Sequence, residues 1–448
     1  MGRYNLKYGS YGQPVHYEEG EPTCYTDEWK RTSPDYVVYL PQQFMGWDTD
    51  NVHFLVTETP KGDLLGFWTQ GTYEGSDNEC VVAARSTDGG QSWGEPVEID
   101  GPDVRYQVAT YASPVVSDSG RIYLLYGKIL DESLTAGHQL ARDRTVTALR
   151  GRVSDDDGHT WSDPVDFEIR RTRYDSEDPA IPPAFIIWQK PIRDSKGRWI
   201  FSYSSGRHKS KVSTPGCESE ARCMFIRFDN LNDGPDLEDL ELTFLPESED
   251  GLEAPHPTEP GTRRTWEASL ALLPDGRLFA PMTTRMGALW YSVSEDDGAT
   301  WRETEPLRYR DDGERVLHPA SPGPLFALAD GRYLLQYHNN EGNASGGPQP
   351  LHGLPYGFNR RSLFIAVGEY QPDAHQPIWF SKGKRIADTD GVSAGIQGRN
   401  DCATYGSLTE KGGKRILWYP DRKHFLLGKE IPDELLADMN WAPEAVLE

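Results

Sequence analysis

Side chains capable of acid–base or nucleophilic chemistry recur at one position relative to a repeated turn glycine. Nine residues before the glycine stand His53, Tyr111, Trp188 and Glu267, and the corresponding region of the last repeat holds Tyr405. Histidine, glutamate and tyrosine transfer protons or attack electrophilic carbon, so His53, Glu267 and Tyr405 are candidate catalytic residues. Tyr111 and Trp188 offer aromatic platforms for a substrate. Together these residue types predict a sugar-binding catalytic site.

Polar side chains follow the turn glycines at a similar distance. Arg285 and Asn340 stand nine residues after two of these glycines, and Gln70 lies near the same place in the first repeat. Gln189 directly follows the candidate platform Trp188. Guanidinium and amide groups form directed hydrogen bonds with carboxylates and hydroxyls, so we expect these four residues to bind substrate.

These positions belong to a strand–turn–strand repeat that runs along the chain. Each copy has a glycine-centred turn followed by an apolar strand, which is typical of an antiparallel hairpin. The six copies read TPKGDLLGFW, SDSGRIYLLY, DSKGRWIFSY, LPDGRLFAPM, LADGRYLLQY and EKGGKRILWY. One small sheet per copy, repeated around an axis, predicts an all-β fold, a six-bladed β-propeller.

The N-terminal part of the chain decides how this ring closes. The stretch Tyr36–Tyr39 predicts a strand that closes the last blade, so that residues 1–448 form a single β-propeller domain. The alternative is a propeller of seven blades, in which residues 1–50 form a sheet of their own.

Hairpin geometry predicts where the chemically capable side chains meet. The two strands of a hairpin are antiparallel, so the start of the first strand and the end of the second lie on one rim. The candidate residues before and after the turn glycines are therefore expected at the same mouth of the central channel.

A second signature, S-x-D-x-G-x-[ST]-W, follows three of the copies, at residues 86–93, 154–161 and 294–301. It is an Asp box, a tight turn in which the aspartate caps backbone N–H groups and the tryptophan packs against the blade. We expect these turns on the opposite rim, with a structural role for their aspartates. Three Asp boxes in phase with the hairpins resemble the sialidase-like superfamily of propellers, over nearly the full chain.

The resemblance implies roles for residues on the fourth and fifth blades. Residues 266–269 (WEAS) and Arg285 resemble the blade that supplies a glutamate and one arginine of a carboxylate-binding triad. Residues 359–362 (NRRS) resemble the strand with another triad arginine, here Arg361, although the adjacent Arg360 could be the one that faces inward.

The resemblance also implies a nucleophile and an acid/base group. Residues 403–408 (ATYGSL) resemble the strand that carries the family's tyrosine nucleophile, which makes Tyr405 the candidate. Asp77 falls where sialidases place their acid/base aspartate.

The first blade departs from the sialidase pattern. Sialidases begin this blade with an Arg-Ile-Pro motif, whereas residues 51–56 read NVHFLV here, with His53 in place of the arginine. This version is more similar to related propellers that cleave uronate-containing polysaccharides. They include ulvan-type lyases and rhamnosyl-glucuronate-cleaving enzymes, which use histidine with tyrosine and arginine.

We therefore expect a carbohydrate-active enzyme that cleaves an acidic glycan, either uronate-containing or rhamnose-capped. A polysaccharide lyase would use Arg285 and Arg361 to neutralise the uronate carboxylate, while His53 and Tyr405 transfer the protons. An exo-glycosidase would pair Glu267 with the acid/base aspartate or activate Tyr405 through Glu267. The alternatives are an exo-α-sialidase and a non-catalytic glycan-binding propeller.

Composition restricts partners and cofactors. The net charge of −24 excludes nucleic acid and anionic membranes as expected partners, and no apolar run is long enough to span a bilayer. No signal peptide is apparent, so a periplasmic or secreted location would require that one had been removed. No cofactor is required and no spacing fits zinc, but a structural Ca²⁺ is compatible with the many acidic residues. Cys217 and Cys223 are close enough in sequence for a local disulfide, or all five cysteines are unpaired.

Overall fold

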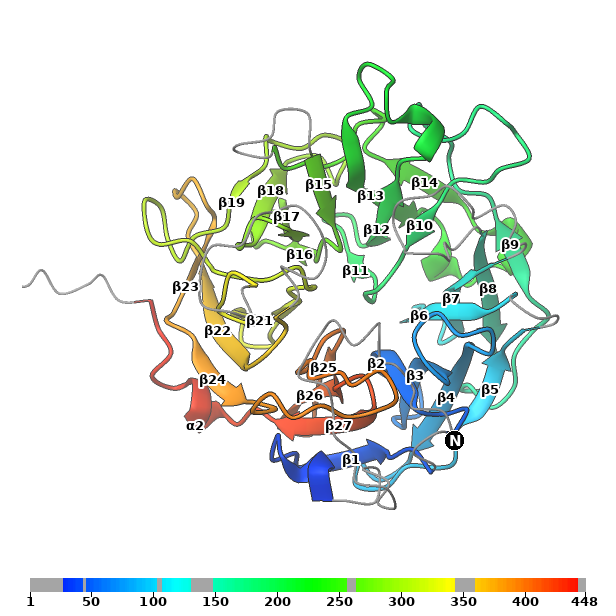
Figure 1. The fold of residues 1–448 in the computed structure, drawn as a ribbon, viewed down its shortest axis with the longest axis vertical. Coiled ribbons are helices and arrows are strands. Elements are labelled where there is room, and N and C mark those ends of the chain that lie inside the picture. Colours follow the sequence, from blue (N-terminus) through cyan, green and yellow to red (C-terminus); the bar gives the residue numbers. More distant parts are fainter. Residues whose placement is uncertain are drawn as a thin grey trace, which may run out of the picture.

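The protein is a six-bladed β-propeller, as a computed structural model shows for residues 27–42, 46–102, 107–129, 148–255, 263–342 and 359–441. The blades are antiparallel sheets arranged around a central axis (Figure 1). This arrangement confirms the all-β, six-bladed prediction. It also leaves no seventh sheet in the described part of residues 1–50, because the strand there joins the last blade.

Each blade begins at the axis and proceeds outward. The first blade contains β2 (Asp50–Glu58), β3 (Leu64–Gly71), β4 (Cys80–Ser86) and β5 (Val97–Asp100). The second contains β6 (Ala109–Val116), β7 (Ile122–Lys128), β8 (Ala148–Ser154) and β9 (Val165–Phe167).

The third and fourth blades have divided inner strands and are joined to each other. The third contains β10 (Phe185–Ile186), β11 (Ile192–Arg193), β12 (Trp199–Gly206), β13 (Ser219–Phe228) and β14 (Leu242–Leu245). The fourth contains β15 (Arg263–Trp266), β16 (Ala271–Leu272), β17 (Leu278–Thr284), β18 (Trp290–Ser294) and β19 (Glu305–Pro306). A short parallel pairing of β13 with β15 connects the two sheets.

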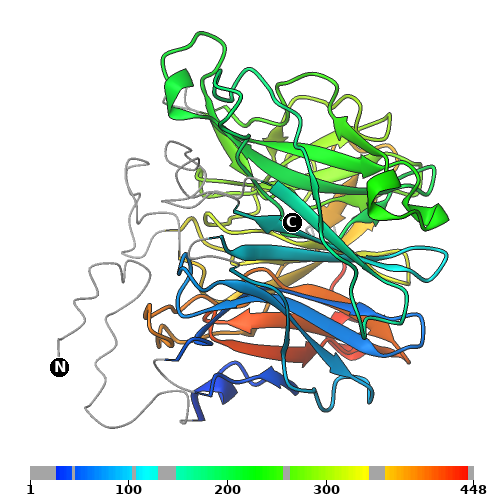
Figure 2. The same ribbon diagram turned by 90° about the vertical axis from the view of Figure 1, so that its right-hand side faces the viewer.

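The sixth blade takes its outermost strand from the N-terminal region. The fifth blade contains β20 (Leu325–Ala327), β21 (Tyr333–Tyr337), β22 (Leu363–Tyr370), β23 (Ile378–Phe380) and β24 (Lys384–Ala387). The sixth contains β25 (Ser407–Lys411), β26 (Lys414–Asp421), β27 (Phe425–Glu430) and β1 (Tyr36–Tyr39). Figure 2 shows the blue N-terminal strand beside the red strands of this blade.

Helices are short and peripheral. The described helices are η2 (Asp27–Lys30), η3 (Lys209–Lys211), η4 (Leu231–Asp233), η5 (Leu237–Asp239) and α2 (Asp433–Leu436).

The turn glycines adopt the backbone conformation that the hairpin prediction requires. Gly62, Gly120, Gly276 and Gly331 have φ between +85° and +92°, a region that residues with a Cβ rarely enter. The turn glycine fixes the register between the first two strands of its blade. It thereby also sets where the residue nine positions before the glycine lies.

The core lies between blades. Within the described residues, six clusters of buried apolar side chains each join two adjacent blades. The Asp-box tryptophans extend this packing toward the preceding blade: Trp93 lies 5.5 Å from Trp418, and Trp301 lies 4.6 Å from Phe225, between ring centroids.

The Asp-box aspartates hold their own turns. The Oδ1 atom of Asp156 accepts the backbone N–H of Thr160 at 2.8 Å, and Asp88 and Asp296 accept the equivalent N–H of Ser92 and Thr300. The boxes follow β4, β8 and β18, at the blade ends opposite the candidate residues. These contacts support the structural role expected for the three aspartates.

Candidate active site

Four residues in or next to the inner strands β2, β6, β15 and β25 have an unusual backbone conformation. His53, Tyr111, Glu267 and Tyr405 have φ of 56°, 61°, 54° and 67°, although none is glycine. The pairing of β2 with β3 and of β6 with β7 shifts register around His53 and Tyr111, which therefore lie in β-bulges. A bulge re-aims one side chain, and strained non-glycine residues cluster at functional sites.

Hydroxyl groups of the preceding blade stabilise two of these strained positions. The backbone N–H of Tyr111 donates to Thr69 Oγ1 of β3 at 3.0 Å, and that of Glu267 donates to Ser204 Oγ of β12 at 2.7 Å. Each hydroxyl lies on the second strand of its blade, and each N–H belongs to the next inner strand. The irregular backbone is thus satisfied by neighbouring side chains and not by its own sheet.

Tyr405 and Glu267 form a directly hydrogen-bonded pair between the sixth and fourth blades. The Tyr405 hydroxyl donates to Glu267 Oε1 at 2.6 Å, while Glu267 Oε2 has no hydrogen-bond partner among the described residues. Burial raises the pKa of Glu267 above its ordinary value and raises that of Tyr405 well above 10. Glu267 is therefore the better base of the pair, and Tyr405 is a phenol whose proton already points at it.

His53 lies between two tyrosine rings. Its ring centroid is 4.1 Å from that of Tyr111 and 4.2 Å from that of Tyr405. Burial and then the charge of Lys423 lower the pKa of His53 well below 6.5, so the imidazole is neutral at neutral pH. Its Nδ1 atom has no hydrogen-bond partner within the described ranges. A neutral imidazole with a nitrogen unengaged by the protein can act as a general base.

Trp188 and Gln70 complete the walls of this cluster. The Trp188 ring centroid lies 6.4 Å from that of Tyr405, and its Nε1 has no hydrogen-bond partner in the described chain. Gln70 Nε2 donates to Asn51 Oδ1 at 2.9 Å, which leaves Gln70 Oε1 without a partner there. The structure thus brings His53, Tyr111, Trp188, Glu267 and Tyr405 together, as their register predicts.

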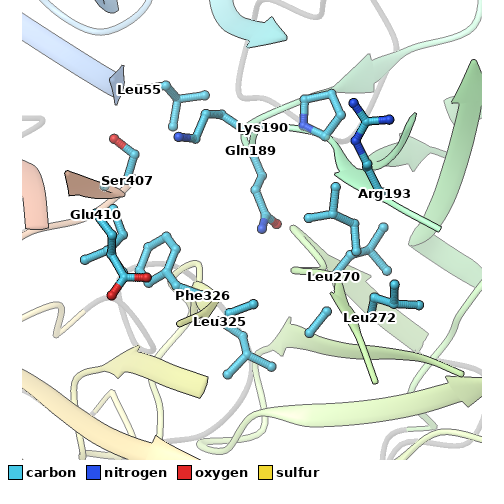
Figure 3. A pocket seen from close by; sticks show the side chains of 16 residues that line it. Leu55, Gln189, Lys190, Arg193, Leu270, Leu272, Leu325, Phe326, Ser407 and Glu410 are labelled. Carbon is cyan, nitrogen blue, oxygen red and sulfur yellow. The ribbon is translucent and has the colours of Figure 1, made fainter. Parts of the chain in front are cut away.

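A separate cavity of about 450 Å³ lies in the central channel beyond this cluster (Figure 3). Its walls include Leu55, Lys190, Leu270 and Ser407, which follow cluster residues by two or three positions, and Leu325 of the fifth blade. Figure 3 shows the Gln189 side chain reaching into this cavity, so Gln189 faces the channel and not the rim where we expected it.

The arginines occupy different environments. The Arg285 guanidinium lies 5.6 Å from the ring of Trp266, the residue that precedes Glu267 in the sequence. Arg360 is buried, with its guanidinium 6.0 Å from the Tyr405 ring and its Nε donating to the Ala320 carbonyl at 2.9 Å. Arg361 instead forms an ion pair with Asp388 at 3.1 Å. The residue that faces the cluster is therefore Arg360. This corrects our choice of Arg361 and agrees with the alternative that Arg360 is the inward-facing arginine.

Asn340 has a local structural task. Its Nδ2 donates to the carbonyls of His338 and Asn359, both at 3.1 Å, and its Oδ1 accepts the N–H of Gly342 at 2.8 Å. These bonds engage both ends of the amide. Asn340 thus orders the chain around it and does not offer the amide to a substrate, contrary to our expectation.

The loop between β3 and β4 contributes an acidic residue that we did not expect, in addition to Asp77. Asp77 is half-buried in this loop, and Glu74 lies three residues before it. Glu74 forms ion pairs with Arg399 and with Lys423, the latter at 2.8 Å. The Lys423 Nζ atom lies 5.4 Å from the Tyr405 ring centroid.

Sequence patterns did not single out Glu74, Arg399, Lys423 or two buried carboxylates beside them. Asp50 and Asp401 lie in this ionic cluster, and burial followed by the charge of Glu74 raises the pKa of Asp50 to about 7. Asp401 lies 3.7 Å from Arg360 and 4.0 Å from Arg399. The available signal was the charge run Arg399-Asn400-Asp401 shortly before Tyr405.

Metal and disulfide chemistry find little support in the described residues. No three or more His, Cys, Asp or Glu side chains of the described part are grouped so as to hold a metal ion, so we identify no ligands for the Ca²⁺ that the composition allows. Cys217 and Cys223 are both buried free thiols, and the local disulfide is not formed. No helix in the described ranges is long and apolar enough to cross a bilayer.

Comparisons with known proteins agree on architecture. Residues 62–414 match the profile of a family described as BNR repeat-like domain. A sialidase from Paraclostridium sordellii is 32% identical over 117 residues. That match covers 25% of this chain and 28% of the relative, so the chain spans only about a quarter of the curated protein it resembles.

Solved structures extend the likeness across the chain. A protein of unknown function from Dyadobacter fermentans is 13% identical, with a TM-score of 0.58 over 88% of this chain and 96% of its own. The NanB sialidase of Streptococcus pneumoniae is 11% identical, with a TM-score of 0.57 over 90% and 71%. The intramolecular trans-sialidase of Ruminococcus gnavus is 16% identical, with a TM-score of 0.53 over 89% and 98%. At these identities the likeness concerns the fold.

Proposed function

The chain belongs to the family of BNR repeat-like domains, in keeping with the sialidase-like resemblance of its Asp boxes, and we propose that it cleaves a glycosidic bond in an acidic glycan. The observation that carries the proposal is the 2.6 Å hydrogen bond from Tyr405 to Glu267 within a cluster of aromatic and cationic side chains. The preferred substrate class is a uronate-containing or rhamnose-capped glycan.

The pair supports cleavage by nucleophilic attack. The Tyr405 oxygen attacks the anomeric carbon as its proton passes to Glu267, and the sugar–oxygen bond to the leaving group breaks. The leaving oxygen takes a proton from an acid, for which Asp77 in the β3–β4 loop is the candidate. Water then attacks the anomeric carbon of the glycosyl-tyrosine intermediate and gives a proton to the Asp77 carboxylate, while the bond to Tyr405 breaks and Glu267 returns its proton to the Tyr405 oxygen.

The cationic side chains support an acidic substrate. Arg360 and Lys423 lie close to the Tyr405 ring, and Arg399 lies beside Lys423 on Glu74, in a protein whose net charge is −24. Such a protein repels anions overall, so a local group of cations indicates recognition of a negative group. Planar guanidinium groups suit a carboxylate because they offer paired donors.

A second candidate reaction is β-elimination at a uronate, favoured by the state of His53. Its neutral imidazole, with Nδ1 unengaged by described residues, suits removal of the proton α to a carboxylate. Arginine would stabilise the enolate-like intermediate, and Tyr405 or Tyr111 would protonate the leaving oxygen. The product would carry a carbon–carbon double bond and no added water.

Product analysis tests these reactions together. The protein is incubated with ulvan-like, rhamnosyl-glucuronan and sialyl substrates, and products are followed by mass and near-ultraviolet absorbance. A product that gains water supports the Tyr405 reaction, whereas an unsaturated, absorbing product supports elimination. Robust release of sialic acid with no cleavage of the uronate glycans would overturn the preferred substrate class. Binding without turnover, unchanged by His53→Ala or Tyr405→Phe, would instead identify a glycan-binding propeller.

A further inference from the structure

Two cations of the sixth blade hold one carboxylate of the first blade through both of its oxygens. Lys423 Nζ donates to Glu74 Oε1 at 2.8 Å, and Arg399 Nη2 donates to Glu74 Oε2. Lys423 lies in the turn between β26 and β27, and Arg399 lies in the segment before β25. Glu74 lies in the loop between β3 and β4.

The cations are buried, whereas the glutamate side chain is partly exposed. The side chains of Lys423 and Arg399 are 2% and 6% exposed, whereas that of Glu74 is 32% exposed. Backbone pairing fixes both cations: the Lys423 carbonyl accepts from Asn51 N at 2.8 Å, and Arg399 exchanges two backbone hydrogen bonds with Ala394. Of the three groups, the carboxylate is therefore the one that an incoming ligand can replace.

The charge of this site suits an anion. Burial lowers the pKa of Lys423 below its ordinary value, which shows that the ammonium is poorly solvated. Burial alone would raise the pKa of Glu74, but Arg399 and Lys423 hold it below its usual range. The two cations thus bind a carboxylate strongly, and they do so 5.4 Å from the Tyr405 ring, measured from Lys423 Nζ.

We propose that Arg399 and Lys423 form the subsite for the carboxylate of a uronic acid residue in the substrate, and that Glu74 occupies this subsite in the free protein. The inference rests on the proposed function for the identity of the ligand. In this arrangement the first blade carries His53 in place of an arginine, and the neighbouring sixth blade supplies the cations that bind the carboxylate. A sugar bound there by its carboxylate lies beside Tyr405.

Binding of small sugars tests the subsite without turnover. Titrations followed by NMR or calorimetry measure the affinity of methyl glucuronide, with methyl glucoside as the neutral match, for wild type, Glu74→Ala and Glu74→Gln. If Glu74 occupies the subsite about nine-tenths of the time, its removal should strengthen glucuronide binding by about tenfold. Methyl glucoside binding should not change.

Variants of Lys423 test the other half of the subsite. Lys423→Met should reduce the affinity for methyl glucuronide to that for methyl glucoside, and Lys423→Arg, which keeps the charge, should retain the preference. Lys411→Met is the matched control, because Lys411 belongs to the same blade and forms an ion pair with Glu58 at 2.9 Å, near the turn at the other end of β25. Thermal unfolding confirms that each variant is folded.

The outcomes separate this inference from the proposed function. Unchanged or weaker glucuronide binding in both Glu74 variants would overturn the subsite, whatever the protein does to glycans. Stronger binding in Glu74→Ala that Lys423→Met abolishes would establish the subsite, even if wild type cleaved none of the tested glycans and the proposed function failed.

Discussion

The hydroxyl of Tyr405 donates a 2.6 Å hydrogen bond to Glu267, although the two residues are 138 positions apart in sequence. Both residues have positive φ and belong to different blades, Glu267 just after β15 and Tyr405 just before β25. The backbone is therefore distorted at both of the positions whose side chains meet. A pair held at this cost indicates function more than stability.

Removal of either member of this pair should abolish most of the activity. Tyr405→Phe and Glu267→Gln should each lower kcat by at least about 100-fold, because each loses a proton-transfer or nucleophilic group. The double variant should be little worse than either single one, since the residues act as a unit. Steady-state kinetics on the cleaved glycan provide the measurement.

Tyr419→Phe is the matched control for this experiment. Tyr419 is a buried tyrosine of the same blade, and its hydroxyl is 2.9 Å from Thr32 Oγ1, away from the cluster. It should lower stability and leave kcat within about twofold of wild type. Equal loss of kcat in Tyr419→Phe and Tyr405→Phe would contradict the assignment.

The pH dependence of kcat/KM should report the ionisation of Glu267. A base must be deprotonated to act, and burial raises the pKa of Glu267 above 4.5. Activity should therefore fall on the acid side at a pH above that of an ordinary glutamate. Burial lowers the pKa of His53 well below 6.5, so this imidazole is the competing source of an acid limb. A pH–rate profile of His53→Gln that keeps the acid limb would agree, whereas loss of the limb would assign it to His53.

Sequence regularity predicted the ring of candidates because the turn glycines set a common register. The position nine residues before Gly62, Gly120 and Gly276 identified three of the residues that meet at the axis. The bulges that aim two of them were not predictable, because the irregular backbone is satisfied by a hydroxyl group of a neighbouring blade, as with Thr69 and Tyr111.

Contacts made by loops could not be predicted from the register of the turn glycines. Glu74 and Lys423 meet across 349 positions, from a loop and a turn whose paths no strand periodicity describes. The choice between Arg360 and Arg361 failed for a related reason. Ser362 has φ of 58°, and an irregular backbone at that point removes the alternation from which the inward side chain is inferred.

Arg360 should therefore matter more than Arg361. Arg360→Ala should lower kcat/KM on an acidic glycan by about 10- to 100-fold, the range for loss of a buried charge-assisted hydrogen bond. Arg361→Ala should change it by less than about threefold, because Arg361 is 37% exposed and pairs with Asp388. The same pair of variants on a carboxyl-reduced glycan is the control. An equal effect of Arg360→Ala on both glycans would show that its partner is not the substrate carboxylate.

Buried histidines should make the fold sensitive to mild acid. His338 and His424 are buried, and burial lowers the pKa of each to about 4 from an ordinary value of 6.5. As the pH falls from 6.5 to about 4, the unfolded chain binds protons that the folded protein refuses, so stability falls over that window and levels off below it. Each histidine contributes up to about 3 kcal/mol to this loss.

The contribution of one histidine can be isolated by difference. Asp50 acts in the opposite sense, since its pKa is raised to about 7 and the folded protein takes up that proton first. Subtracting the curve of His424→Gln from that of wild type removes this and every other shared group. The difference in free energy of unfolding between wild type and His424→Gln, from urea titrations, should be constant above pH 6.5. Below pH 6.5, wild type should lose stability relative to the variant. A pH-independent offset for His424→Gln would mean that its imidazole protonates in the folded protein as readily as in the unfolded chain, and that burial does not hold it neutral.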